Sequence, residues 1–242
     1  MKTNIKKEYI EIDKNRYMET KERILRKIAY RWLDFFYNLN IRAEVLTSFR
    51  LLFALVTIIF IAFGSLLASF IFMLIYQFVV MTDYIDGKLA KKQGRFKERW
   101  KYLDFFTHYI ICILFLAAFS LRIFLDNGSL FFLVIGLFSG FLLLLNSMAT
   151  ADYYYLGRYN KLFRKGKKQE ERSKFAGWLY SFIRIEEPFS LPFIFVFLQL
   201  LFSNLVNFYM ILVVIYFIIY GASVFMRFIN SFRSIKNEPK NP

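Results

Sequence analysis

Cysteine and histidine are almost missing from this chain, which limits the chemistry it can perform. The single cysteine, Cys112, lies inside an apolar run, so the sequence offers no disulfide and no redox motif. It is best interpreted as a small buried hydrophobic residue. The single histidine, His108, lies close to three aspartates in the sequence, and this makes its imidazole a candidate site residue.

Acidic residues are also scarce, with 18 Asp and Glu against 33 Lys and Arg, although 57% of the chain is hydrophobic. Apolar and basic residues must therefore be segregated, as is typical of a membrane protein with basic faces. An excess of Lys and Arg over Asp and Glu would also suit a protein that binds nucleic acid. A nucleic-acid-binding protein, however, does not need uninterrupted apolar segments of about 20 residues, the length that crosses ~30 Å of hydrocarbon. We therefore expect no nucleic-acid partner.

We expect no cleavable signal peptide, because the sequence opens with a polar stretch from Met1 to Arg23. From about Tyr17 to Tyr37, apolar and basic residues separate onto two sides of a predicted helix. The apolar side consists of Ile24, Leu25, Ile28, Trp32, Phe35 and Phe36, and the basic side of Lys21, Arg23, Arg26, Lys27 and Arg31. This pattern predicts an amphipathic helix that lies on an anionic membrane surface. The alternative is a solvated basic helix.

Six apolar runs follow this segment. They cover Val45–Phe63, Leu66–Met81, Tyr102–Leu125, Leu130–Met148, Phe189–Leu205 and Phe208–Phe228. The sequence therefore predicts an all-α integral membrane protein with six transmembrane helices and an N-terminal interfacial amphipathic helix. We expect residues 1–43 to form the basic cytoplasmic segment with that helix, residues 44–230 to form the membrane domain, and residues 231–242 to form a cytoplasmic tail.

The distribution of positive charge predicts the orientation. Lys and Arg are concentrated in residues 1–42, 88–101 and 158–184 and after Met226, whereas the turns near Gly64 and Ser203 carry no charge. The positive-inside rule then predicts a multi-pass cell-membrane protein with both termini in the cytoplasm. The aspartate cluster that begins at Asp83 is expected on the same side.

Three aspartates and His108 occupy the junction between the second and third runs. Asp83 and Asp86 are three residues apart and Asp104 and His108 are four apart, so each pair shares one helix face. Two carboxylates brought to ~4 Å repel by about 4 kcal/mol at an effective dielectric near 20. Asp83 and Asp86 are also expected near a helix C-terminus, where the macrodipole disfavours each anion by roughly 0.3–1 kcal/mol. A hard ion such as Mg²⁺ or Mn²⁺ would offset these costs.

The same residues resemble the motif of the CDP-alcohol phosphotransferases, which are integral membrane enzymes of phospholipid synthesis. That motif reads Asp-x2-Asp-Gly-x2-Ala-Arg-x8-Gly-x3-Asp-x3-Asp. The corresponding residues here are Asp83, Asp86, Gly87, Ala90, Lys91, Trp100, Asp104 and His108, and five of the eight match. Lys91, Trp100 and His108 depart from the pattern. The run from Ala43 to Arg50 is also similar to the family's first-helix entry, Pro-Asn-x-Leu-Thr-x-x-Arg, without its Pro-Asn.

The resemblance implies a metal-dependent enzyme that moves a phosphatidyl or phospho-alcohol group from a CDP-linked donor to an acceptor hydroxyl and releases CMP. It implies metal ligands at Asp83, Asp86, Asp104 and His108, with His108 also as catalytic base. The implied donor-binding residues are Gly87, Ala90, Lys91, Arg50 and Trp100. Imidazole has an unperturbed pKa near 6.5, which suits proton abstraction near neutrality. The family is expected to work as a homodimer among membrane lipids, and the sequence does not identify the acceptor.

Two other interpretations stay open. A catalytically silent relative, which binds a lipid or nucleotide or serves as an assembly subunit, is compatible with the departures at Lys91, Trp100 and His108. A transporter is compatible with six spans, but its charged site is expected at mid-membrane rather than at the cytoplasmic rim. Glu186 and Glu187 lie beside Pro188 at the start of the fifth span. They either cap that helix or replace the last aspartate of the family motif, where this chain has His108.

Overall fold

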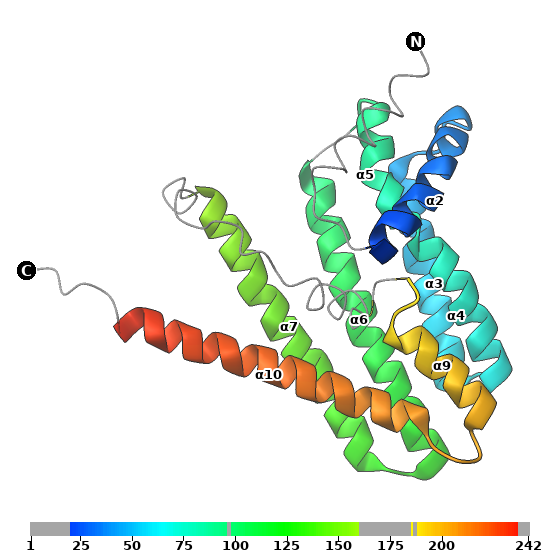
Figure 1. Ribbon diagram of the computed structural model, residues 1–242, viewed down its shortest axis with the longest axis vertical. Helices are drawn as coiled ribbons and strands as arrows, with labels where there is room; N and C mark the ends of the chain where they lie inside the picture. The colour runs from blue at the N-terminus through cyan, green and yellow to red at the C-terminus, as the bar shows by residue number, and fades with distance from the viewer. Residues whose placement is uncertain (1–19, 96–97, 160–184, 186–187, 237–242) are drawn as a thin grey trace, which may run out of the picture.

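The part of the chain that the structure describes is entirely helical (Figure 1). A computed structural model describes residues 20–95, 98–159, 185 and 188–236, with side chains described at 24–95, 106–146, 185 and 188–229. The helices in these residues are α2 (Thr20–Asn38), α3 (Ala43–Phe63), α4 (Leu66–Val80), α5 (Asp83–Lys92), α6 (Glu98–Asn127), α7 (Leu130–Tyr159), α9 (Leu191–Phe202) and α10 (Phe208–Lys236). The domain boundary predicted after residue 230 thus falls inside α10.

Four helical segments in these residues are long and apolar enough to cross a membrane. They are Ala43–Phe63, Leu66–Lys92, Phe106–Asn127 and Phe208–Ile229, with mean hydropathies of 2.4, 1.8, 2.1 and 2.3. A helix rises 1.5 Å per residue, so about 20 residues cover the ~30 Å of a hydrocarbon core. The chain is therefore a membrane protein. The other two predicted spans correspond to α7, of which Leu130–Asn146 is the apolar part with described side chains, and to the shorter helix α9.

Small polar residues join α3 and α4 across their tight turn. Ser65 caps α4 by accepting a hydrogen bond from the Ala68 amide at 3.2 Å. The Ser69 hydroxyl donates to the Phe60 carbonyl of α3 at 2.8 Å. In hydrocarbon, where water cannot satisfy these groups, such contacts link neighbouring helices. The hairpin places the beginning of α3 and the end of α4 at the same end of the bundle.

Helices α6 and α7 approach each other closely at Gly136, where an added Cβ would collide with the Ser120 side chain. Small residues permit this close backbone approach. Helix α10 packs on α7, and the Ser223 hydroxyl donates to Asn146 Oδ1 at 3.1 Å. Figure 1 shows α10 crossing α7 obliquely. The main core is formed where α6 contacts α3, α7 and α10.

The chain passes from α4 into α5 with only a two-residue interruption, at Met81 and Thr82, whose backbones stay right-handed helical. The Thr82 hydroxyl donates to the Val79 carbonyl at 2.7 Å, and the Asp86 amide donates to the Thr82 carbonyl at 3.1 Å. The expectation that Asp83 and Asp86 lie at a helix C-terminus is therefore wrong. Both acids occupy the first turn of α5, where the macrodipole stabilises an anion instead of opposing it.

Helix α2 lies beside α5 at one end of the molecule (Figure 1). Three side chains of α2, Leu25, Ala29 and Leu33, are buried, and Ala29 and Leu33 share a core with Ile85 and Leu89 of α5. Four residues of the predicted apolar side of α2 are exposed, namely Ile24, Ile28, Trp32 and Phe35. The single apolar face predicted from the sequence is thus divided, because Leu25 faces the protein while these four side chains face outward.

Candidate functional site

Asp83 is tied to α3 by Arg50. The Nη1 atom of Arg50 forms an ion pair with Asp83 Oδ1, and Arg50 is only 1% exposed. A guanidinium taken out of water costs several kcal/mol unless an anion accompanies it. The Asp83 carboxylate supplies that anion. The sequence predicted Arg50 as a donor-binding residue, and the structure brings it onto the first aspartate of the motif.

The second oxygen of Asp83 faces α6. His108 Nε2 lies 3.4 Å from Asp83 Oδ2, and the two side chains are 21% and 25% exposed. Arg50, Asp83 and His108 therefore meet from three different helices, α3, α5 and α6. Of the four residues expected to converge on one site, the structure brings Asp83 and His108 into contact.

Asp86 is held by a residue that the sequence analysis did not name as part of the site. The Thr47 hydroxyl of α3 donates to Asp86 Oδ2 at 3.2 Å. Thr47 and Arg50 are three residues apart, as are Asp83 and Asp86, so two neighbouring side chains of α3 meet two of α5. The signal for Thr47 was present, because it belongs to the same run from Ala43 to Arg50 that suggested Arg50.

Two predicted site residues have side chains outside the described residues. The backbone of α6 begins at Glu98, so Trp100 and Asp104 belong to this helix, and Asp104 precedes His108 by one turn. Nothing further is described for either side chain. Glu186 and Glu187 also lie outside the described residues.

The ligand chemistry of the site suits a hard divalent ion, because carboxylate oxygens predominate. Among the described side chains, however, no three acids, histidines or cysteines are arranged to hold an ion. Asp83 contacts Arg50 and His108, whereas Asp86 contacts Thr47. A complete metal site thus needs a further ligand, and Asp104 is the residue that the motif offers.

One face of α5 is open. Asp83, Gly87 and Lys91 follow one another at intervals of four residues, so they share this face, and Gly87 and Lys91 are exposed. A Cβ at Gly87 would meet no atom within 4 Å, and its φ is not positive. Packing and backbone geometry in the described residues therefore do not explain why glycine occurs here. Ala90 is half-buried beside this face.

The opposite side of α5 is fastened to α2. The Lys88 ammonium lies 3.7 Å from the centre of the Tyr30 ring, and Lys92 Nζ pairs with Asp34 Oδ1 at 2.8 Å. The Gln93 side-chain amide donates to the Ile41 carbonyl at 2.7 Å. The Lys88 and Gln93 contacts, together with the buried apolar ones, hold the helix that carries Asp83 and Asp86 in place, whereas the pair with Asp34, which is 57% exposed, adds little.

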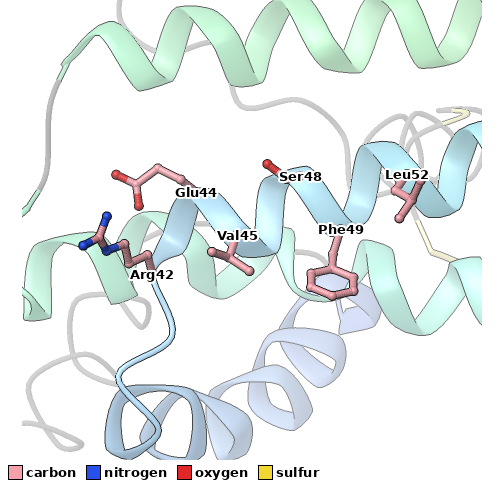
Figure 2. Close-up of a pocket in the computed structure, with 6 residues that line it drawn as sticks. All are labelled: Arg42, Glu44, Val45, Ser48, Phe49 and Leu52. Carbon is pink, nitrogen blue, oxygen red and sulfur yellow. The ribbon is translucent and has the colours of Figure 1, made fainter.

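A groove of about 470 Å³ lies along the first turns of α3. It is lined by Arg42, Glu44, Val45, Ser48, Phe49 and Leu52 (Figure 2). Figure 2 shows Arg42 and Glu44 at one end of this row and Leu52 at the other. Apart from the Ser48 hydroxyl, the rest of the groove is apolar, because it is formed by the exposed side chains of Val45, Phe49 and Leu52. The groove therefore has a charged end and an apolar wall. This combination suits a lipid, which has a polar head group and apolar acyl chains.

Comparison with known proteins identifies no relative. No protein-family model matches the chain, and neither a curated protein nor a solved structure matches it. The resemblance to the CDP-alcohol phosphotransferases therefore depends on the motif residues alone.

Proposed function

We propose that the protein is a membrane phosphotransferase of phospholipid synthesis. It transfers a phosphatidyl or phospho-alcohol group from a CDP-linked donor to an acceptor hydroxyl and releases CMP. The observation that carries the proposal is the meeting of Arg50, Asp83 and His108 beside the open face of α5. The three side chains supply an imidazole, a carboxylate and a guanidinium at the end of apolar helices. Such a site suits a donor with a charged head group and apolar chains.

In this reaction an acceptor oxygen forms a new bond to phosphorus, and the bond between that phosphorus and the CMP oxygen breaks. His108 is the proposed general base that takes the acceptor's hydroxyl proton, a role worth roughly 10²–10⁴-fold in rate. The donor is proposed to lie along the open face of α5, where Gly87 permits close approach of a phosphate to the backbone. Lys91 on the same face adds positive charge, and Ala90 and Trp100 complete the proposed donor contacts.

Mg²⁺ or Mn²⁺ is the proposed cofactor, with Asp83, Asp86, Asp104 and His108 as the candidate ligands. When bound, such an ion supplies positive charge to the phosphoryl oxygens. The proposal is supported by the oxygen-rich ligand chemistry and by the contact between Asp83 and His108.

We further propose that the chain crosses the cell membrane six times, with α7 and α9 completing the spans and the site and both termini in the cytoplasm. In this arrangement α2 lies in the membrane interface. Its exposed apolar residues support this placement, because Trp32 and Phe35 are accompanied by exposed Lys27 and Arg31. The groove along α3 is a candidate site for a lipid, and a homodimer is the proposed assembly.

The decisive experiment measures CMP release by the purified full-length protein. CDP-diacylglycerol or another CDP-alcohol is supplied with a panel of acceptor alcohols, with Mg²⁺, with Mn²⁺ or with EDTA. We expect metal-dependent CMP release by the wild type and a 10²–10⁴-fold lower turnover in His108→Ala, with nearly unchanged donor affinity. Asp34→Asn, which alters the contact with Lys92 away from the site, is the matched control and should keep its activity.

The alternative function is a silent relative that binds a lipid or nucleotide, or serves as an assembly subunit. One observation favours it: Arg50 already provides Asp83 with a positive partner. In that case the wild type should bind a radiolabelled CDP-linked lipid but release no CMP with any acceptor. This outcome would reject the transferase and retain the binding site.

A further inference from the structure

We propose that the outward face of α2 docks on anionic phospholipid headgroups and that this docking stabilises α5, the helix that carries Asp83 and Asp86. The outward face consists of Ile24, Ile28, Trp32 and Phe35 together with Lys27 and Arg31. The inference rests on the membrane arrangement of the proposed function, and it adds a regulation of the same site. The charge of the lipid surface is the regulating signal.

The outward face of α2 has an apolar stripe with positive charge along one border. Because a helix turns by about 100° per residue, the four apolar members lie within about 80° of one another around the axis. Lys27 and Arg31 are exposed directly beside this stripe. Apolar side chains in such a helix enter the boundary between headgroups and acyl chains, whereas Lys and Arg extend toward the headgroup phosphates. The pattern therefore fits a lipid surface better than water.

The charge of the outward face complements an anionic leaflet. Among the described side chains, neither Lys27 nor Arg31 forms an ion pair with an acid. Asp34, which follows Arg31 by about one turn, pairs instead with Lys92 of α5 at 2.8 Å. The one described carboxylate of α2 is therefore neutralised on the side of α5, and the positive charge of the outward face is not offset there. Basic residues of this kind are attracted to anionic headgroups.

The connection between α2 and α3 keeps the outward face close to the membrane. Helix α2 ends at Asn38, and the apolar span Ala43–Phe63 begins five residues later. Five residues reach at most about 18 Å even when they are fully extended. Helix α5 packs on another side of α2 (Figure 1). The surface of the bilayer is therefore within reach of the outward face while α5 stays in contact with α2.

Helix α5 connects α2 to the candidate site. Leu33 of α2 shares a core with the buried residues Ile85 and Leu89 of α5, and this core is separate from the main core of the bundle. The two acids in the first turn of α5 contact α3. Lipid that holds α2 in place raises the free energy needed to open any element that shares its core. Docking of α2 therefore stabilises α5 and, through it, the first turn that carries the acids.

The test is hydrogen–deuterium exchange of the full-length protein in lipid nanodiscs, followed by mass spectrometry. One set of nanodiscs contains phosphatidylcholine alone, and the other contains equal parts of phosphatidylcholine and phosphatidylglycerol. We expect the backbone amides of α2 to exchange more slowly in the anionic set, by about fivefold for each of the two cations, and those of α5 to slow with them. The turn between α6 and α7, at Gly128, lies at the other end of the bundle and should not respond (Figure 1).

Substitutions separate the docking surface from the link to α5. Lys27→Gln and Arg31→Gln should each reduce the lipid dependence of both helices about fivefold. Arg95→Gln is the matched control, because it also removes an exposed positive charge but lies outside α2, and it should leave that dependence unchanged. Leu89→Ala loosens the shared core. In this variant α2 should keep its response to lipid charge while α5 loses it.

The wild type alone can refute the inference, so the test does not depend on the folding of a variant. Equal exchange of α2 in the two sets of nanodiscs would overturn docking on anionic headgroups, and a response of α2 without α5 would overturn the link to the site. An equal loss in Arg95→Gln would assign the effect to overall charge and overturn the role of the outward face. Exchange requires no turnover. A failure to release CMP would therefore reject the proposed reaction without changing the docking result, and unchanged exchange would reject docking without excluding the reaction.

Discussion

Removing either member of the Arg50–Asp83 ion pair should destabilise the protein, and the two removals should differ in cost. Arg50 is 1% exposed, whereas the Asp83 side chain is 25% exposed. Asp83→Asn therefore leaves a guanidinium where water does not reach, while Arg50→Met leaves a carboxylate that water partly reaches. Breaking a buried pair costs about 3–5 kcal/mol. We expect Asp83→Asn near the upper end of this range and Arg50→Met near the lower end.

The assay is a double-mutant cycle in the free energy of unfolding. Wild type, both single variants and the double variant are unfolded from mixed micelles with a denaturing detergent and followed by far-ultraviolet circular dichroism. Because the double variant has no charge on either partner, its loss should be smaller than the sum of the single losses, by roughly 0.5–3 kcal/mol. Asp34→Asn provides the exposed-pair control, since Asp34 is 57% exposed and such pairs contribute about 0–1 kcal/mol.

Two results would refute this reasoning. Additive losses would show that Arg50 and Asp83 do not interact energetically. A smaller loss for Asp83→Asn than for Arg50→Met would show that burial of the guanidinium does not set the cost.

Further predictions concern two glycines and the orientation in the membrane. Gly136→Ala should destabilise the protein by about 1–3 kcal/mol, because its Cβ would collide with Ser120, and detergent unfolding would measure the loss. Gly87→Ala should leave the free energy of unfolding unchanged or raise it slightly, because its Cβ meets open space. The same substitution should raise the KM for the donor in the CMP assay. An unchanged KM would contradict the donor role of Gly87. Lys91→Cys should react with an impermeant thiol reagent only in opened cells, and labelling of intact cells would reverse the proposed orientation.

The apolar runs predicted the positions of the membrane helices closely. The run Val45–Phe63 corresponds to α3, Ala43–Phe63, and Phe208–Phe228 lies within α10, Phe208–Lys236. The agreement has a physical reason: in hydrocarbon a backbone must satisfy its own hydrogen bonds, and a single segment can do so only as a helix. The same rule did not predict the start of α5. Hydropathy marks where the apolar surface ends, whereas the hydrogen bonds around Thr82 let the helix resume with Asp83 in its first turn.

The sequence by itself determined which site residues share a helix face. Asp83 and Asp86 are one turn apart, as are Asp104 and His108, because a helix repeats every 3.6 residues. Only the tertiary structure decided the partners between helices. Thr47 and Asp86 are 39 residues apart, and Asp83 meets Arg50 and His108 from two different helices. Helical periodicity orders side chains around one axis, but the rotation and approach of neighbouring helices depend on packing across the whole bundle.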